Sequence, residues 1–367
     1  MKVARYDYGA QFPDLEALMA RLRTLIVQGH YVMSGEVPEF EAALAAYLEV
    51  PHAFGTNCGT DALLLALHAL GVGPGDEVLT QANTFHATVN AICRVGAIPV
   101  LVDADERTFN LDPRQLPAAV TPRTRVLLPV HLFGKPAPMG PVLELAAAHG
   151  LYVVEDAAQA IGARWRGRRV ASLGDLGCFS FHPSKNLAAA GDGGAVVTRH
   201  AGLVGGLELW RYFGQSQPNV HDLVGLNSKL DSLQAVILQS KLPWMDRWNV
   251  GRRAAAAAYR ERLAGLPLAL QAEEPDEEHV YHLFQVRTPA RDALLAALRA
   301  AGIDAVVRWP IPIPLQAAFA DRGWRRGQFP VAERLAEELL CLPIRPDLPL
   351  DEIEFVCERV RAFFGGA

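Results

Sequence analysis

The sequence predicts an α/β fold: a large domain with a mostly parallel central sheet flanked by helices, followed by a smaller C-terminal α+β domain. Short runs rich in Val, Leu and Ile alternate with helical stretches between about residues 52 and 200. These runs are continuously apolar, as is typical of strands that are covered on both faces. The pattern changes after Gly225, and 367 residues are enough for two domains.

The large domain is predicted to span residues 1–250, and its clearest helix runs from Thr60 to Leu70. Thr60 is an N-cap candidate and Gly71 a stop signal. This helix is apolar nearly all round, so we expect it to be buried. A long helix is expected from Lys229 to about Trp248. The expected strands are EVLT (77–80), IPVLVD (98–103), RVLLPVHL (125–132), LYVVED (151–156), CFSFH (178–182) and GAVVT (194–198).

The smaller domain is predicted to span residues 251–367 and to begin with a helix in the alanine-rich stretch after Arg253. Asp351 and Glu354 resemble a capping box in which Asp replaces the usual Ser or Thr. The other expected elements are a strand at 281–288, a helix at 290–300, a strand at 303–309, a helix at 331–340 and a final helix from Asp351.

Composition excludes several classes of function. The net charge of −5, without a basic stripe, argues against a nucleic-acid partner. The five cysteines are scattered and form no Cys-x-x-Cys pair, which argues against disulfides and a zinc site, and we expect no metal. No apolar run reaches the roughly 18 residues that span a membrane, and the N-terminus lacks a signal-peptide core. We therefore expect a cytoplasmic protein.

Lys185 is the first candidate for chemistry. It lies in FSFHPSKNLAAAGDGG, after a predicted strand and before a glycine-rich segment that lets a ligand approach the backbone. The chain has only five lysines against thirty arginines. A partly buried lysine has a lowered pKa and can form a Schiff base. The alternative is an exposed loop lysine, so the prediction depends on partners.

Asp156 is the strongest partner, because it ends the predicted strand LYVVED. Ligands of open α/β sheets bind beyond the carboxyl ends of the strands. A carboxylate there can keep the pyridine nitrogen of pyridoxal phosphate protonated. Gln159 could then reach the phenolic oxygen of the ring. The alternatives are a helix-capping aspartate and a solvated glutamine.

A phosphate site is predicted where Gly59 and Thr60 open the buried helix. Backbone N–H groups at a helix start, with the Thr60 hydroxyl, attract an anion. Ser180 can add a second hydroxyl. Phe85 could lie against a cofactor ring, although its pattern fits a core aromatic better. His182 could move a proton, or it could simply be a packed strand histidine.

Together these segments resemble the DegT/DnrJ/EryC1/StrS sugar aminotransferases, which have the aspartate-aminotransferase fold, the type I fold of pyridoxal-phosphate (PLP) transferases. The similarity follows the order of that family over almost the whole chain. The matching stretches are SGEVPEFEAALAAYL, TNCGTDALLLAL, GVGPGDEVLTQANTF, VEDAAQAIGA, GDLGCFSFHPSKNLAAAGDGGAVVT, GLNSKLDSLQAVIL and FPVAERLAEELLCLP.

The resemblance implies roles for these residues. Lys185 would hold pyridoxal 5'-phosphate and shuttle a proton, and Asp156 would pair with the pyridine nitrogen. Asn227 matches an asparagine that reaches the phosphate of the partner subunit, which implies a homodimer with shared active sites. The other implied cofactor contacts are Gly59, Thr60, Phe85, Gln159 and Ser180.

The resemblance also implies a reaction. L-Glutamate would leave as 2-oxoglutarate, pyridoxamine phosphate would remain, and a nucleotide-linked keto-sugar would accept the amine. A dTDP-linked 3-keto or 4-keto 6-deoxyhexose is the expected acceptor, with a UDP-linked sugar left open. The alternatives are another ketone such as a cyclitol, or a catalytically silent relative acting as a binding or regulatory partner. Arg308-Trp309-Pro310 replaces the usual His-Tyr-Pro, and Asn57-Cys58 is less usual than Ser-Asn.

Overall fold

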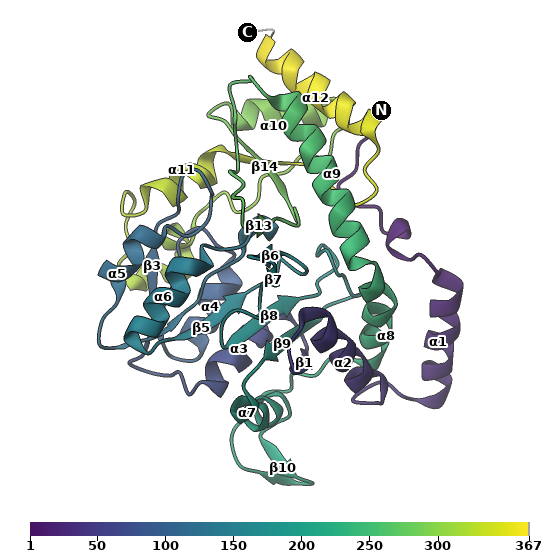
Figure 1. The fold of residues 1–367 in the computed structure, drawn as a ribbon, viewed down its shortest axis with the longest axis vertical. Coiled ribbons are helices and arrows are strands. Elements are labelled where there is room, and N and C mark those ends of the chain that lie inside the picture. Colours follow the sequence, from purple (N-terminus) through teal and green to yellow (C-terminus); the bar gives the residue numbers. More distant parts are fainter. Residues whose placement is uncertain (366–367) are drawn as a thin grey trace.

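A computed structural model describes residues 1–365, and within them a seven-stranded sheet forms the centre of the molecule (Figure 1). The strands lie in the order β1-β9-β8-β5-β4-β2-β3. β9 runs antiparallel to β1 and β8, and the other neighbouring pairs are parallel. The strands are β1 (His52–Thr56), β2 (Glu77–Gln81), β3 (Ile98–Val102), β4 (Thr124–Leu127), β5 (Tyr152–Asp156), β8 (Leu176–Ser180) and β9 (Gly194–Thr198).

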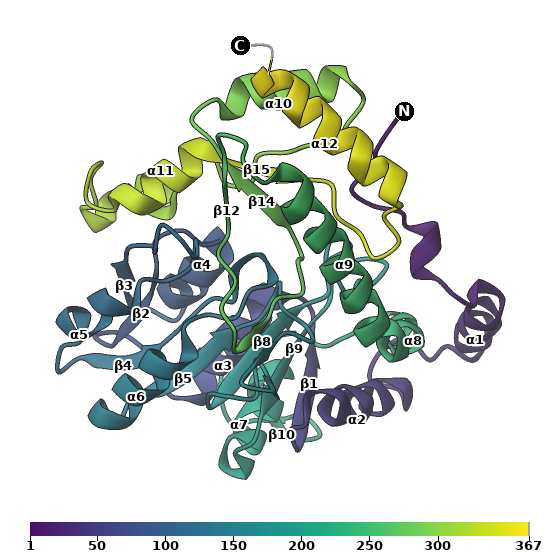
Figure 2. The same ribbon diagram turned by 45° about the horizontal axis from the view of Figure 1, so that its top comes forward.

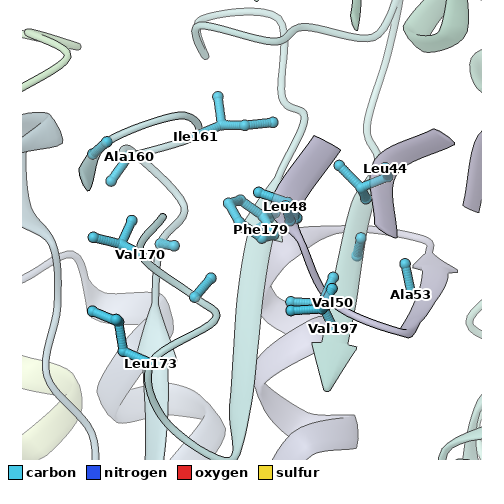
Figure 3. Close-up of a cluster of buried hydrophobic side chains, with 14 of the residues drawn as sticks. Leu44, Leu48, Val50, Ala53, Ala160, Ile161, Val170, Leu173, Phe179 and Val197 are labelled. Atoms are coloured by element: carbon cyan, nitrogen blue, oxygen red, sulfur yellow. The ribbon is translucent and has the colours of Figure 1, made fainter. Parts of the chain in front are cut away.

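Helices cover both faces of this sheet. Successive strand residues point to opposite faces, and apolar side chains lie on both of them. Val78 packs with one apolar cluster and Leu79 with the other. Figure 3 shows part of the second cluster, in which Leu44 and Leu48 accompany Phe179. The first cluster includes α3 (Gly59–Ala69), α4 (His86–Arg94) and α7 (Ala201–Arg211), and the second includes α2 (Glu36–Leu48), α6 (Met139–His149) and α8 (Ser232–Lys241).

The C-terminal part has its own small antiparallel sheet, which lies above the large one in Figure 2. Its core includes Tyr259 and Phe284, whose rings stack with centroids 4.9 Å apart. Helix α9 runs continuously across residue 250, so the division into 1–250 and 251–367 stays a prediction. The elements are α9 (Met245–Leu263), β12 (Ala269–Leu270), β14 (Phe284–Arg287), α10 (Arg291–Ala300), α11 (Pro330–Glu338), β15 (Leu339–Leu342) and α12 (Leu350–Gly365).

Helix α1 and several short elements are the remaining α-helices and strands of the described chain. The hairpin of β10 and β11 projects from the body, at the bottom of Figure 1. A second small sheet pairs β13 with β6 and β6 with β7. The bounds are α1 (Leu15–Gln28), α5 (Leu116–Ala119), β6 (Arg164–Trp165), β7 (Arg168–Arg169), β10 (Gln215–Gln217), β11 (Val220–His221) and β13 (Glu277–Glu278).

Some predicted elements differ from the structure. The long helix expected from Lys229 is interrupted by a 3₁₀ turn at Leu242–Trp244, where Pro243 lacks the N–H of a continuous helix. The expected strand at 303–309 is absent from the described chain, which forms only isolated bridges there. Leu339–Leu342, partly assigned to a helix, is a strand.

Two predicted helix starts are also wrong. The N-cap of α3 is Cys58 rather than Thr60, and no side chain caps that end. Helix α12 already begins at Leu350, so Asp351 lies within its first turn. Both differences are of one or two residues, which is the usual uncertainty of helix ends.

No helix in residues 1–365 is both long and apolar enough to cross a membrane. The same residues contain no group of three or more His, Cys, Asp or Glu side chains that could hold a metal ion. All five cysteines are free thiols, of which Cys58 and Cys93 are half-buried.

Candidate active site

One cleft, with a volume of about 250 Å³, lies at the carboxyl ends of β5 and β8. It is also lined by the start of α3 and by residues 282–283 and 308–309 from the C-terminal part. The structure therefore brings together groups that are far apart in the sequence. Seven of the eight predicted site residues line it: Gly59, Thr60, Phe85, Asp156, Gln159, Ser180 and Lys185.

Lys185 is held in the cleft by a turn that follows β8. Its backbone N–H donates to the carbonyl of His182 at 2.8 Å. Burial lowers the pKa of Lys185 to about 8, while Asp156 opposes this shift and Arg308 adds to it. Near neutral pH roughly a tenth of this amine is therefore uncharged and able to attack a carbonyl carbon.

Asp156 ends β5 and is only 5% exposed. Its Oδ2 accepts a hydrogen bond from Thr88 Oγ1 at 2.9 Å, and its Oδ1 accepts one from the Ala158 N–H at 3.1 Å. Burial raises the pKa of Asp156 above its ordinary value, and these two hydrogen bonds and the charge of Lys185 oppose that rise. A cationic ligand atom beside this oriented carboxyl would stabilise its charged form.

The start of α3 forms a cradle that fits an anion. Cys58 is extended at the N-cap and offers no side-chain hydrogen bond, so the first N–H groups of the helix have no side-chain cap. A Cβ on Gly59 would lie 2.6 Å from the Cβ of Ser180, so only glycine allows this close approach. Thr60 and Ser180 place their hydroxyls in the same cleft. The positive helix end and these donors suit a phosphate group.

Gln159 and Phe85 complete the predicted set. Gln159 Oε1 accepts a hydrogen bond from the Phe133 N–H at 2.7 Å, which leaves its NH₂ group to donate to a ligand. Phe85 is 42% exposed, so the interpretation as a core aromatic is wrong. Its ring lies 6.2 Å from that of Trp309, centroid to centroid, and both rings line the cleft.

Thr88 and His282 were not predicted from the sequence. Thr88 lies 68 residues before Asp156 along the chain, and no local pattern links the two. His282 comes from the C-terminal part, and burial together with Lys185 lowers its pKa well below the ordinary value. Only tertiary structure reveals these neighbours.

Asn227 does not line this cleft. It forms an isolated bridge with Tyr212, and its Oδ1 accepts a hydrogen bond from Lys229 Nζ. Its implied role toward a partner subunit therefore stays a prediction.

A lysine of lowered pKa, a buried carboxyl and a phosphate cradle at the strand ends of a mostly parallel sheet define an enzyme of the pyridoxal-phosphate aminotransferase class. The chain belongs to the DegT/DnrJ/EryC1/StrS aminotransferase family, whose model matches residues 14–361. It is a pyridoxal-phosphate-dependent sugar aminotransferase, as the sequence had predicted.

Similar proteins of known name match this chain over nearly its full length. A dTDP-3-amino-3,4,6-trideoxy-alpha-D-glucose transaminase of Streptomyces venezuelae is 45% identical, covering 98% of this chain and 96% of its own. A UDP-N-acetyl-3-dehydro-alpha-D-glucosamine 3-aminotransferase of Acidithiobacillus ferrooxidans is also 45% identical, covering 96% and 97%. The crystal structure of S. venezuelae DesV in complex with a ketimine intermediate matches with a TM-score of 0.96, 45% identity and coverage of 99% and 98%.

Proposed function

We propose that this enzyme transfers an amino group from L-glutamate to the keto group of a dTDP-linked 6-deoxyhexose. The observation that carries the proposal is the joint presence of Lys185, Asp156 and the start of α3 in one cleft. Carbon 3 is the favoured acceptor, because the names of both relatives place the amino group there. A UDP-linked sugar is the nearest alternative, since the two relatives are equally similar to this chain.

Different residues of the cleft would bind different groups of the cofactor. The Gly59 and Thr60 N–H groups and the Ser180 hydroxyl would bind the phosphate of pyridoxal phosphate. The Asp156 carboxylate would pair with the protonated ring nitrogen, and the Gln159 NH₂ group would donate to the phenolic oxygen. When bound, the cofactor supplies an electron sink for the carbon that loses a proton.

Lys185 would act on the substrate itself. Its charge interacts with the buried Asp156, and with a pKa of about 8 it can both accept and release a proton near neutral pH. It would remove the proton from the donor carbon that bears the amine. In the second half-reaction it would deliver a proton to the sugar carbon that receives the amine. Phe85 would cover one side of the ring and keep water from that carbon.

A homodimer with shared sites is part of the proposal. Asn227 lies outside the cleft of its own chain, so its contact with a phosphate would have to be made in a partner subunit. Nearby, Val224 is 93% exposed and Val220 is 47% exposed. Exposed apolar side chains of this kind are typical of surfaces that are covered in an oligomer.

A panel of acceptors tests the substrate. The enzyme is loaded with cofactor and L-glutamate, then offered a dTDP-3-keto-6-deoxyhexose, its 4-keto isomer, a UDP-linked 3-keto sugar and a cyclitol ketone, with products identified by mass and NMR. Highest kcat/KM for the dTDP-linked 3-keto sugar supports the proposal. Amination of the cyclitol alone would contradict it, and no amination of any ketone would favour a binding or regulatory role.

A further inference from the structure

Arg308 lies in the wall of the cleft that contains Lys185. The backbone around it is fixed on both sides. Val306 exchanges two backbone hydrogen bonds with Cys341, at 3.2 and 2.8 Å. Trp309 has a positive φ of 52° and stacks on Phe133, with ring centroids 5.7 Å apart. These contacts hold the backbone on both sides of Arg308 against the rest of the fold.

The guanidinium of Arg308 has no carboxylate partner within residues 1–365. Its Nη2 donates to the neutral hydroxyl of Tyr6 at 3.2 Å, and it takes part in none of the ion pairs of that part of the chain. By contrast Arg5, the neighbour of Tyr6, pairs with Asp304 at 2.9 Å. A guanidinium that lines a cleft and has no counter-charge is free to bind an anionic ligand there.

The acidic residues of the cleft do not supply that anion. Asp156 is engaged by Thr88 and the Ala158 N–H and interacts with Lys185. Asp192 lines the cleft but is exposed, and it forms no ion pair with Arg308. The positive charge of Arg308 acts on Lys185: it lowers the pKa of Lys185 in addition to the effect of burial.

The ligand that fits is a carboxylate, because the planar guanidinium fork binds carboxylate oxygens in pairs. In an amino acid the carboxylate is attached directly to the carbon that bears the amine. A donor whose amine reaches Lys185 therefore brings its α-carboxylate to the adjoining wall. The diphosphate of a nucleotide sugar is separated from the keto carbon by atoms of the sugar ring, so it would lie farther away.

We propose that Arg308 binds the α-carboxylate of the amino donor and that Tyr6 is a positioning residue for its guanidinium. The inference rests on the proposed function, because it requires an amino acid as donor. Hydrogen bonding to Tyr6 occupies Nη2 and leaves the other nitrogen atoms for the ligand. The N-terminal segment is itself tied to residues 302–304 through Val3 and Arg5, which keeps Tyr6 in place.

The test compares two donors that differ only in this group: L-glutamate and 4-aminobutyrate, which is glutamate without its α-carboxyl group. The cofactor-loaded wild type, Arg308→Gln, Arg308→Lys and Tyr6→Phe are compared with the control Arg262→Gln, which removes a guanidinium that pairs with Glu354 at 3.1 Å and does not line the cleft. Donor half-reactions are followed by absorbance. Binding of 2-methyl-L-glutamate, which keeps the carboxylate but cannot lose a proton, is measured as a Kd without turnover.

In Arg308→Gln, kcat/KM for L-glutamate should fall about 10- to 100-fold, as expected for losing hydrogen bonds to a charged group. The Kd of 2-methyl-L-glutamate should rise by a similar factor, while kcat/KM for 4-aminobutyrate and the KM of the keto-sugar stay within about threefold. Arg308→Lys should lose less than Arg308→Gln, because it keeps the charge but not the fork. Tyr6→Phe should mainly raise the donor KM, by a smaller factor, and Arg262→Gln should match the wild type.

Equal losses for L-glutamate and 4-aminobutyrate, or a keto-sugar KM that rises as much as the donor KM, would overturn the role of Arg308. A wild type that uses another amino acid instead of glutamate would refute only the proposed donor. The same variants would then be tested with that amino acid and its decarboxylated amine.

Discussion

Gly59→Ala is predicted to damage the phosphate cradle specifically. The added Cβ would lie 2.6 Å from the Cβ of Ser180 and 3.1 Å from its Cα. Carbon atoms pack at about 3.5–4.0 Å, so the start of α3 or the end of β8 must move by roughly 1 Å. Such overpacking costs about 1–3 kcal/mol of stability. The same movement shifts the N–H groups of Gly59 and Thr60, and losing one charge-assisted hydrogen bond, about 1.5–3 kcal/mol, raises the cofactor Kd roughly 10- to 100-fold.

The assay titrates cofactor-free protein with pyridoxal phosphate and, in parallel, with pyridoxal, which lacks the phosphate. Gly59→Ala should weaken the first ligand by the stated factor and the second by less than about threefold. Gly205→Ala in α7 is the matched control, because no atom lies within 4 Å of its added Cβ and alanine favours a helix by about 1 kcal/mol. Unchanged pyridoxal phosphate affinity in Gly59→Ala, or equal weakening of both ligands, would refute the assignment of the cradle.

Three further predictions concern the other site residues. Asp156→Ala should lower kcat about 100-fold or more, because the ring nitrogen loses a buried counter-charge worth about 3–5 kcal/mol. Steady-state kinetics at saturating cofactor measure this effect. An undiminished kcat would remove Asp156 from the site. The rate at which cofactor-free protein binds pyridoxal phosphate covalently should increase as the pH rises to about 8 and then level off, because only uncharged Lys185 reacts. Stopped-flow absorbance measures this rate. If the pKa of Lys185 were ordinary, the rate would continue to increase toward pH 10. Asn227→Ala should weaken phosphate binding in the opposite subunit, and cofactor loss confined to the mutated subunit of a mixed dimer would argue against shared sites.

The large sheet could be predicted because most of its strands are covered on both faces. Runs such as those at 98–102 and 194–197 are apolar without alternation, and the structure places strands there. Strand β1 gave no such signal, since its sequence HAFGT contains small residues. The apolar run at Leu339–Leu342 is compatible with either a helix or a strand. It forms a strand because it pairs with β14, and that pairing cannot be read from the run itself.

The sequence could predict that Lys185 and Asp156 lie close together, because a motif and a strand end coincide there, and the structure places both in one cleft. The sequence could not show that Thr88 holds the Asp156 carboxyl, because that contact joins α4 to β5 across the fold. Nor could it show that Tyr6 meets Arg308, a contact between residues 302 positions apart. The N-terminal segment and residues 302–309 are joined by backbone hydrogen bonds at Val3 and by the ion pair of Arg5 with Asp304.

In the proposed reaction Lys185 carries the amino-group chemistry. The most direct test is the absorbance spectrum of cofactor-loaded protein before and after addition of L-glutamate, for the wild type and for Lys185→Ala. The wild type should show a bound pyridoxal phosphate band that converts to the pyridoxamine form, and Lys185→Ala should bind cofactor without that conversion. A wild type that shows no bound band even with added pyridoxal phosphate, or a variant that converts as fast as the wild type, would contradict the account.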